Sequence, residues 1–148
     1  MTGIAAMTEG RVIGSDGGIP WRSQKDFAHF RKMTLGRDVV FGRKTFQNLP
    51  TLRGRRVWVL GAGFYQKLDG AQYPYRYVQD IDLLPKDCMV AGGAKVYEAL
   101  LPYCEEFYLT LIRGEYSGDT YMPVFEHLYA DYELVESDDE LEIRRYFR

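Results

Sequence analysis

The sequence predicts an α/β protein, a three-layer sandwich whose central eight-stranded sheet is mostly parallel and carries helices on both faces. One observation is that short, almost continuously apolar runs, typical of strands covered on both faces, alternate with helical segments; these runs are VVF, VWVL, CMVA and FYLTLI. A second is that the last two β-rich runs alternate apolar with polar residues around Ser137–Glu140. This pattern predicts an antiparallel C-terminal hairpin at one edge of the sheet.

Eight strands and three helices are expected along the chain, with no repeat or linker between them. The strands are predicted at Gly3–Met7, Asp38–Phe41, Arg56–Leu60, Tyr75–Val78, Cys88–Ala91, Phe107–Ile112, Tyr132–Glu136 and Glu142–Phe147. The helices are predicted at Gln24–Leu35, Lys44–Leu49 and Lys95–Leu101. We expect Gly61–Tyr73 and Arg113–Val124 to be irregular, and residues 1–148 to form one domain.

The composition argues against several classes of function. With 148 residues, 46% of them hydrophobic and 27% charged, the chain has the composition of a soluble globular protein. A net charge of −2 does not suggest a nucleic-acid or membrane-surface binder, and no apolar run approaches the roughly 20 residues that span a bilayer. The N-terminal segment does not resemble a secretory signal, so we expect a cytoplasmic protein. Only Cys88, Cys104 and two histidines are present, which predicts reduced structural thiols and no metal site.

One acid, Asp26, falls within the apolar face of the first predicted helix. Ser23 is typical of an N-cap, and at about 100° per residue Asp26 shares one arc with Phe27 and Phe30. Burial beside two phenylalanine rings would raise the pKa of this carboxyl, as suits a group that handles protons near neutral pH. A second interpretation makes Ser23-x-x-Asp26 a capping box, in which the carboxylate only folds back onto the helix start.

A first candidate ligand site follows the predicted buried strand at Val39–Phe41. The strand continues through Gly42 into a helix that opens with Arg43, Lys44 and Thr45. Ligands of α/β sheets bind at the carboxyl ends of strands, where glycine lets the backbone come close and cations suit a phosphate. The alternative is an ordinary strand-to-helix turn with solvated cations.

A second candidate site follows the next buried strand, where Met89–Ala91 runs into Gly92, Gly93 and a helix. Backbone N–H groups at such a junction commonly hold a pyrophosphate, and adjacent glycines permit an unusual or cis peptide at a ligand. The alternative is a plain tight turn. Tyr97, one turn into the helix, is expected either to pack in the core or to line the pocket.

Two loops complete the candidate site. Leu60–Gln66 begins like the dinucleotide fingerprint G-x-G-x-x-G but lacks its third glycine and a following helix, so we expect only a loop close to a ligand. Gly14–Gly18, which leads into Ile19-Pro20-Trp21, has little side-chain bulk and suits a mobile lid that excludes water from a reacting centre. A simple surface loop is the alternative, although the apolar end of the segment favours docking.

Taken together and in order, these segments resemble dihydrofolate reductase over essentially the whole chain. The matching stretches are IAAMTEGRVIG, IPW, KDFAHF, VVFGRKTF, LRGRR, AGGAKVYEALLP, FYLTLI and GDTYMP. The resemblance implies reduction of 7,8-dihydrofolate to 5,6,7,8-tetrahydrofolate by NADPH, with hydride transfer to C6 and protonation of N5 assisted by Asp26. This reaction supplies the one-carbon carrier for thymidylate and purine synthesis. The resemblance also implies that the protein is a monomer inhibited by antifolates, and that it binds no metal, nucleic acid or membrane.

The resemblance implies roles for individual residues on the substrate side. Asp26 matches the acid that hydrogen-bonds the pterin ring, and Ile19 and Trp21 match lid residues over the reacting rings. Arg55 matches the arginine that pairs with the glutamyl α-carboxylate, and Thr110 the hydroxyl near the pterin amino group. The other implied substrate-binding residues are Ile4, Ala5, Ala6, Phe27, Phe30, Leu49 and Leu52.

On the cofactor side, the resemblance takes in both glycine junctions. Gly92 and Gly93 match a cis pair beside the cofactor, and Arg43–Thr45 matches the segment that grips its phosphates. Asp119 matches a loop acid that steadies the closed lid. The remaining implied cofactor-binding residues are Ala6, Ile13, Gly14, Gly42, Leu60, Gly61, Ala91, Ala94, Lys95, Val96 and Tyr97.

The chain departs from the family pattern at a few positions. Gly61 and Ala62 stand where many relatives have hydroxyl residues that bind the 2′-phosphate of NADPH. The preference for NADPH over NADH therefore depends on the cations Arg43, Lys44 and Lys95. His29 replaces a bulkier aromatic residue that some relatives have near the pterin edge.

Two other functions are open at this point. A reductase of the same fold acting on another heterocycle, such as a riboflavin-pathway pyrimidine, has no evident use for Asp26, Thr110 and Arg55 together. A non-catalytic folate- or nucleotide-binding structural protein could use the twelve tyrosines and the edge hairpin as an interface. The acid Asp26, the lid segment and the pair Gly92–Gly93 are all present, which argues against a non-catalytic protein.

Overall fold

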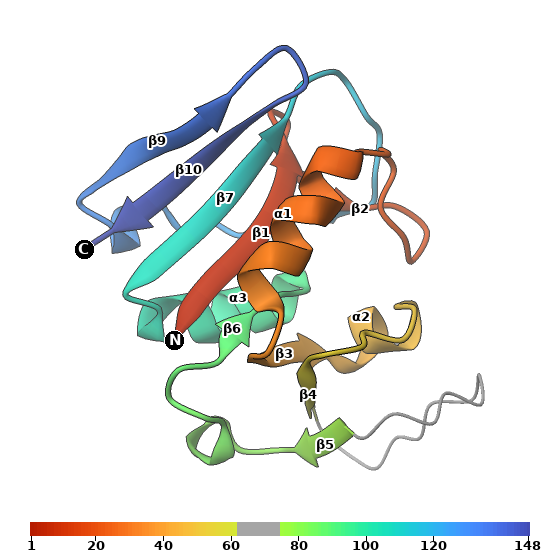
Figure 1. Ribbon diagram of the computed structural model, residues 1–148, viewed down its shortest axis with the longest axis vertical. Helices are drawn as coiled ribbons and strands as arrows, with labels where there is room; N and C mark the ends of the chain where they lie inside the picture. Colours follow the sequence, from red (N-terminus) through yellow and green to blue (C-terminus); the bar gives the residue numbers. More distant parts are fainter. Residues whose placement is uncertain (62–74) are drawn as a thin grey trace.

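The chain forms the predicted three-layer α/β sandwich in a computed structural model that describes residues 1–61 and 75–148 (Figure 1). The main sheet contains β1 (Thr2–Thr8), β3 (Asp38–Gly42), β4 (Arg56–Leu60), β5 (Tyr75–Val78), β6 (Met89–Val90), β7 (Glu106–Ile112), β9 (Asp131–Ser137) and β10 (Leu141–Phe147). Their spatial order is β5-β4-β3-β6-β1-β7-β10-β9. Most of the predicted loop Leu60–Gln66, and nearly all of the predicted irregular segment Gly61–Tyr73, lie outside the described residues.

Parallel pairing brings the ends of most strands to one edge of the sheet. Strand β1 pairs in parallel with β6 and β7, β3 with β4 and β6, and β4 with β5. Strand β10 pairs antiparallel with β7 and β9 and forms the predicted C-terminal hairpin. The segments that follow β1, β3, β4 and β6 therefore leave the sheet at a common edge, which is where open α/β sheets bind ligands.

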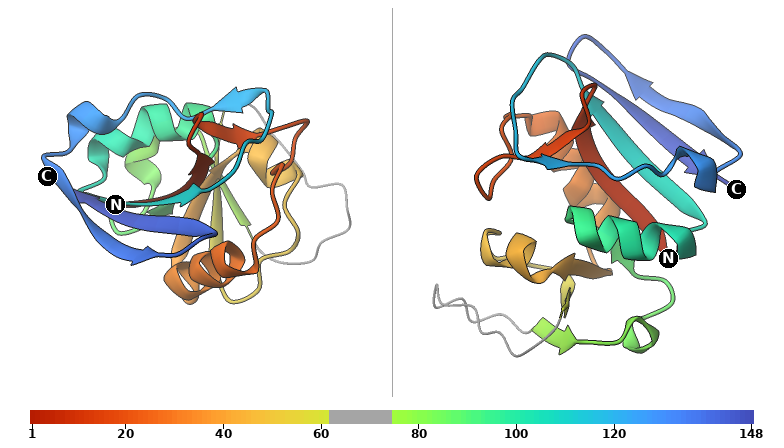
Figure 2. Two further views of the ribbon diagram at one scale, coloured as in Figure 1. Left: turned by 90° about the horizontal axis from the view of Figure 1, so that it is seen from above. Right: turned by 180° about the vertical axis from the view of Figure 1, so that it is seen from behind.

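Helices α1 (Gln24–Thr34) and α3 (Ala94–Leu100) cover opposite faces of this sheet (Figure 2). Because side chains alternate along a strand, β3 sends Val39 into the apolar cluster that includes Phe30 of α1. Its next residue, Val40, joins the cluster that includes α3. Burial on both faces explains why the central strands are almost continuously apolar in sequence.

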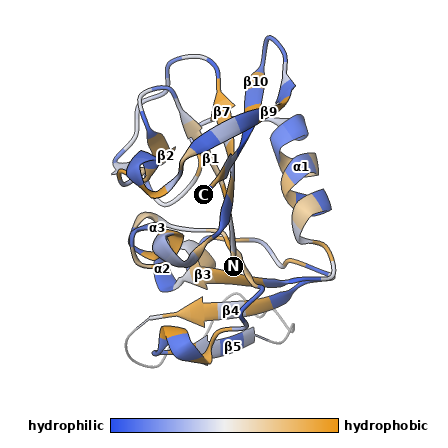
Figure 3. Cartoon of the chain, turned by 90° about the vertical axis from the view of Figure 1, so that its left-hand side faces the viewer, coloured by the Kyte–Doolittle hydropathy of each residue, from blue (hydrophilic) through white to orange (hydrophobic). Residues whose placement is uncertain are grey.

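The C-terminal hairpin forms the polar edge of the sheet. All seven residues of β9 are exposed, whereas β10 buries Leu141, Ile143 and Tyr146. Figure 3 shows the contrast between the hydrophobic strands β3 and β4 and the largely hydrophilic β9. An ion pair between Lys25 and Asp138 ties the hairpin turn to the first turn of α1. The hairpin thus contributes one wall to the region around that helix end.

The short elements differ from the prediction. Strands β2 (Val12–Gly14) and β8 (Thr120–Tyr121) pair in a separate two-stranded sheet, so the expectation that Arg113–Val124 is irregular throughout is wrong. Strands of two or three residues are too short for a period of two to be recognised in sequence. Further short 3₁₀ turns, also not predicted, lie at Ile81–Leu83, Leu101–Tyr103 and Glu126–Leu128.

All three helices end earlier than predicted, and α1 stops at Thr34 with Leu35 as its C-cap. Helix α2 spans Arg43–Gln47 and stops before Leu49, because the N–H of Asn48 donates to Thr45 O at 3.2 Å and its side chain donates to Lys44 O at 2.9 Å. Helix α3 gives way to a 3₁₀ turn after Leu100, since the following Pro102 has no N–H to continue the α-helical ladder. All three changes shift only the last turn.

Cys88 and Cys104 are free and buried. Desolvation raises the pKa of their thiols to about 11 and about 12, which keeps them protonated and unreactive. Across the two described ranges, no helix is long and apolar enough to cross a membrane.

Candidate active site

The first turn of α1 combines both interpretations of the Ser23–Asp26 segment. Ser23 caps the helix, because its Oγ accepts a hydrogen bond from the backbone N–H of Asp26 at 3.1 Å. The cap uses the backbone of Asp26 and not its carboxylate. The residue is only 8% exposed, so its carboxylate is held largely out of water.

Burial gives Asp26 an unusual proton affinity. Desolvation raises its pKa from 3.8 to about 6, and the negative charge of Glu140 acts in the same direction. The indole N–H of Trp21 lies close enough to favour the ionised form and lower the pKa, although Trp21 Nε1 forms no hydrogen bond of normal geometry within the described chain. Desolvation is the largest of these effects, so the Asp26 carboxyl changes its charge near neutral pH.

Two buried polar atoms near this acid have no hydrogen-bond partner among the described residues, Thr110 Oγ1 and Trp21 Nε1. Thr110 is aligned with Ala6 of β1 and Ile143 of β10, and Trp21 packs in a cluster that contains the same two residues. Leaving a buried hydroxyl unpaired costs about 1–3 kcal/mol, so Thr110 Oγ1 points to a ligand group that pairs with it, whereas the Trp21 N–H faces Asp26.

The apolar residues expected around the substrate fall into two groups. Ile4 is buried in the cluster that includes Phe30, Leu49 and Leu52, beneath α1. Phe27 and Ile19 instead are 46% and 50% exposed, which is unusual for large apolar side chains. The side chain of Ala5 packs on the opposite face in the α3 cluster, so only its backbone is available to the cleft.

Arg55 lies in the loop that leads into β4, near the other end of α1. The N–H of Gly36, just after that helix, donates to Gly54 O at 2.6 Å and so holds the loop there. Arg55 Nε and Nη1 are buried and unpartnered within the described ranges, and desolvation together with the nearby Arg31 lowers the guanidinium pKa. The nine-residue separation of Asp26 and Leu35 spans about 14 Å along the helix. Asp26 and Arg55 therefore lie toward opposite ends of α1, a spacing that suits a long ligand with a carboxylate at its far end.

The two glycine junctions, separate in sequence, meet in space. Gly42 N donates to Gly92 O at 2.8 Å, and the Gly92–Gly93 peptide is cis. A Cβ on Gly93 would lie 2.8 Å from Thr45 Oγ1, so only glycine lets the two junctions approach this closely. The other residues expected on the cofactor side at this edge of the sheet are Leu60, Gly61, Ala91, Ala94 and Lys95.

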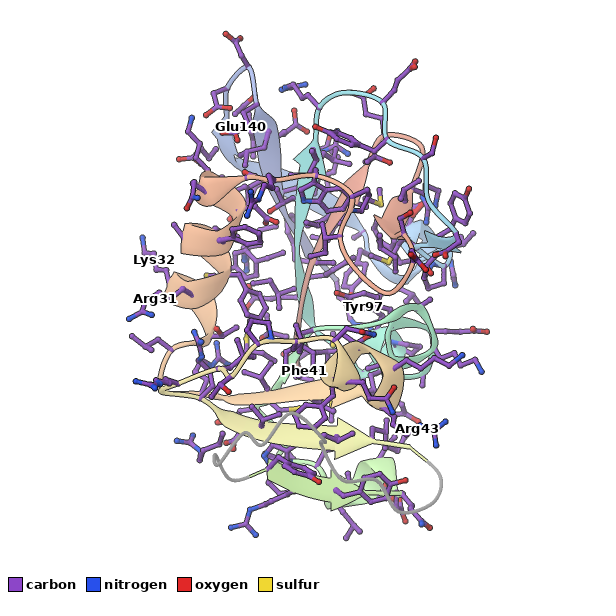
Figure 4. The ribbon with its side chains drawn as sticks, turned by 90° about the vertical axis from the view of Figure 1, so that its right-hand side faces the viewer. Arg31, Lys32, Phe41, Arg43, Tyr97 and Glu140 are labelled. Atoms are coloured by element: carbon purple, nitrogen blue, oxygen red, sulfur yellow. The ribbon has the colours of Figure 1, made fainter. Side chains whose placement is uncertain are left out.

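The alternatives for Tyr97 are decided by burial. Its hydroxyl donates to Ile4 O at 2.8 Å inside the α3 cluster, and burial raises its pKa. Figure 4 shows the ring at α3, while Arg43 lies at the outer rim. Tyr97 packs in the core, and its ring supports Gly92, whose Cβ position would be 3.3 Å from the hydroxyl. Val96 is also buried, beneath Gly42.

The lid segment is held to the loop that carries Asp119. Strand β2, which contains Ile13 and Gly14, pairs with β8, and Asp119 Oδ2 accepts a hydrogen bond from the N–H of Asp16 at 3.0 Å. That bond lowers the pKa of Asp119. At the lid tip, a Cβ on Gly17 would lie 3.2 Å from the Asn48 side chain. The lid therefore reaches from β2 to the end of α2.

Two further residues, His29 and Tyr77, have a buried polar atom without a partner in the described ranges, and only His29 stands out in the sequence, as a departure from the family pattern. His29 Nε2 is buried without a partner in the described part of the chain, its pKa is lowered by desolvation, and its ring lies 6.4 Å from that of Tyr108. The hydroxyl of Tyr77 in β5 is likewise buried and unpartnered. Nothing in the sequence of β5 indicates that the phenol of Tyr77 has no partner in the described part of the chain.

These features define an α/β protein with a buried acid at the start of one helix and paired glycines where two strands end, an arrangement typical of enzymes that bind a nucleotide cofactor. Within the described ranges, no cluster of three His, Cys, Asp or Glu side chains could hold a metal ion. The sequence model of the family described as dihydrofolate reductase matches residues 1–145. The chain belongs to the dihydrofolate reductase family.

Individual relatives agree with this assignment. The chain is 35% identical to dihydrofolate reductase of Bacillus subtilis over 138 residues, which cover 91% of this chain and 81% of that protein. It is 31% identical to the Staphylococcus aureus enzyme, with 86% and 79% covered. A solved structure of Enterococcus faecalis dihydrofolate reductase with NADP(H) and the compound RAB-propyl superposes with a TM-score of 0.83 at 25% identity, covering 99% and 95% of the two chains.

The raised pKa of Asp26 predicts a gain in stability when the acid is neutralised. Because the folded protein holds this proton up to pH about 6 and the unfolded chain releases it near 3.8, stability falls as pH rises through that window and stays lower above it. Asp26→Asn should therefore raise the free energy of unfolding by up to about 3 kcal/mol at pH 7.5 and by little at pH 4. Urea denaturation at both values measures this. Asp139→Asn, in the exposed hairpin turn, is the control, and an equal effect at both pH values would contradict the assignment.

The contact between the lid and the Asp119 loop predicts a steric requirement at Gly118. A Cβ there would lie 2.4 Å from both Gly14 O and Val12 Cγ1. Gly118→Ala should separate β2 from β8, destabilise the protein by about 1–3 kcal/mol and speed hydrogen exchange of the Asp16 and Asp119 amides. Gly10→Ala, whose Cβ has its nearest neighbour at 3.8 Å, is the matched control. Unchanged exchange in Gly118→Ala would show that the pairing tolerates the methyl group.

Proposed function

We propose that the cleft between α1 and the two glycine junctions is where this chain reduces 7,8-dihydrofolate to 5,6,7,8-tetrahydrofolate with NADPH. Membership of the dihydrofolate reductase family supports the reaction and the cofactor. The observation that carries the assignment to this cleft is Asp26, a buried acid whose pKa of about 6 suits proton transfer near neutral pH.

Asp26 serves the proton half of the reaction. Reduction of the C6=N5 bond adds a hydride to C6 and a proton to N5, and NADPH supplies the hydride when bound. The Asp26 carboxyl hydrogen-bonds the pterin ring and supports protonation of N5. Thr110 Oγ1, which is buried without a partner in the described chain, pairs with a polar group on the same ring. Both groups orient the pterin as well as stabilise it.

Arg55 binds the other end of the substrate. A planar guanidinium with two unpaired buried N–H groups suits the two oxygens of the glutamyl α-carboxylate. Phe27 and Phe30 supply the apolar wall between the two ends, together with Leu49 and Leu52.

The cofactor occupies the edge where β3, β4 and β6 end. Gly42, Gly92 and Gly93 let its pyrophosphate and nicotinamide approach the backbone, and Arg43–Thr45 holds the phosphates. Ile19 and Trp21 close over the reacting rings and exclude water, while Asp119 steadies the lid through the N–H of Asp16.

We also propose that the chain acts as a cytoplasmic monomer of one domain and that antifolates inhibit it by occupying the pterin subsite. A reductase of another heterocycle has no ligand group to pair with both Thr110 and Arg55. A non-catalytic binding protein gains nothing from an acid whose burial raises its pKa into the neutral range.

Turnover and its pH dependence test the central role of Asp26. The wild-type chain should oxidise NADPH only when dihydrofolate is added, methotrexate should stop it, and the rate should fall as pH rises above about 6. Asp26→Asn should lose about 100-fold or more at pH 7 and recover partly in acid, where the substrate is protonated in solution. Loss of NADPH absorbance measures both. A wild-type rate for Asp26→Asn at pH 7 would refute its role, and absence of any turnover would refute the reaction.

The role of Arg55 predicts a selective loss of substrate binding. Arg55→Leu should weaken dihydrofolate binding about 100-fold and leave NADPH binding unchanged, because only the substrate pairs with this guanidinium. Arg53→Leu, two residues earlier and exposed, is the control. Calorimetry with dihydrofolate and with 6-methyl-7,8-dihydropterin, which lacks the carboxylate, separates the two ends of the ligand. An equal loss for both ligands, or for NADPH, would rule out the carboxylate pairing.

A further inference from the structure

The turn between β9 and β10 meets the start of α1 next to the acid Asp26. Lys25, the residue before Asp26, forms an ion pair with Asp138 of the turn, and its Nζ lies 3.9 Å from Oε2 of Glu140. Figure 4 shows Glu140 on the hairpin turn, beside the beginning of α1. A cation that adjoins Asp26 in sequence thus brings two acids of a distant hairpin to the same end of the helix.

Hydrogen bonds and packing anchor the backbone of the turn. Asp138 Oδ1 accepts the N–H of Glu140 at 2.8 Å and that of Leu141 at 3.0 Å. Arg113, just after β7, donates through Nε to Asp138 O at 2.8 Å. Leu141 is fully buried in the cluster that contains Trp21. The acid Glu140 is therefore attached to an anchored backbone, directly beside a residue that packs in the same cluster as the lid.

Glu140 is the acid whose negative charge acts on the Asp26 carboxyl. By element, the other titratable groups nearby are Lys25 and His29 of α1, Arg22 ahead of the helix, Tyr97 of α3, and Glu136 and Asp138 of the hairpin. His29 and Tyr97 are neutral at pH 7, because desolvation lowers the pKa of the imidazole and raises the pKa of the phenol. Arg22 is exposed and forms no ion pair with a described residue. Within the described ranges, Glu140 is ion-paired only with Lys25.

We propose that Lys25 and Glu140 are positioning residues for the reaction, and that their opposite charges, held together by the β9–β10 turn, set the share of Asp26 that is protonated at neutral pH. The inference rests on the proposed function, since that share affects catalysis only if Asp26 supports protonation of the substrate. The charge of Glu140 favours the neutral carboxyl of Asp26, which is only 8% exposed, so water screens the effect less than it does between surface groups. Lys25 offsets that charge and limits the effect.

Titration of Asp26 by ¹³C NMR, without substrate or cofactor, measures this effect directly. In protein labelled at the aspartate carboxyl carbons, the Asp26 signal is the one that Asp26→Asn removes. At low salt, Glu140→Gln should lower the Asp26 pKa by about 0.3 unit and Lys25→Gln should raise it by a similar amount. The double variant should return close to the wild-type value, because the two charges offset each other. All shifts should shrink at 1 M KCl, where the Debye length is about 3 Å.

The pH dependence of turnover connects the charge pair to catalysis. The pH at which the rate of NADPH oxidation falls to half should move down in Glu140→Gln and up in Lys25→Gln, by the amounts measured in the NMR titration. The limiting rate in acid should stay unchanged in both variants, because neither residue touches the reacting atoms. Lys25→Arg keeps the charge and should behave as the wild type does.

Two exposed charges supply matched controls. Asp139→Asn in the same turn and Lys32→Gln on the same helix should leave the titration of Asp26 unchanged. If Lys25→Gln and Glu140→Gln caused no shift, or shifted the Asp26 pKa in the same direction, the inference would be overturned, because altered burial and not charge moves both the same way. Opposite shifts in the NMR titration without any change in the pH dependence of turnover would support the charge pair and refute the proposed use of the Asp26 proton in catalysis.

Discussion

The burial of one carboxyl at the first turn of α1 is the constraint on which the rest of the site depends. Asp26 is capped through its backbone by Ser23, so the helix can begin there without using the acid side chain. Desolvation then raises the pKa to about 6, and the Trp21 indole, rather than a cation, opposes that rise. A paired cation would hold the acid ionised, whereas an apolar surrounding keeps it able to exchange a proton. Burial of this acid lowers the free energy of unfolding at neutral pH, where the carboxyl is ionised.

The parallel order of the strands places segments that are distant in sequence at the same edge of the sheet. Because β3, β4, β5 and β6 all end at the same edge, Gly42, Gly61 and Gly92 come together although about 50 residues separate the first from the last. The hydrogen bond from Gly42 to Gly92 O shows how closely the backbones meet. Glycine is required here for proximity between two loops as well as for approach to a ligand. At the same edge, a Cβ on Gly61 would lie 3.7 Å from the Tyr77 hydroxyl and 3.8 Å from Cβ of Arg43.

Several buried donors have no hydrogen-bond partner among the described residues. Thr110 lies near the acid, Arg55 near the far end of α1, and Tyr77 at the cofactor edge. Each would be a defect in a purely structural protein, since buried polar groups are normally satisfied. Their separation along the cleft follows from the length of one helix and the order of the sheet. The fold thus spaces the binding groups before any ligand is present.

The sequence by itself determined the fold class, the principal strands, the capped helix with its buried acid and both glycine junctions. These features are local: apolar runs, helical periodicity and strand–glycine–helix motifs are legible within about ten residues. Only the tertiary structure decided that Tyr97 packs in the core, that Ala5 faces α3, and that β2 pairs with β8. Each of these depends on which distant residues share a face, a register or a hydrogen bond. Strand order and packing decide which distant residues become neighbours, and a short stretch of sequence contains no information about either.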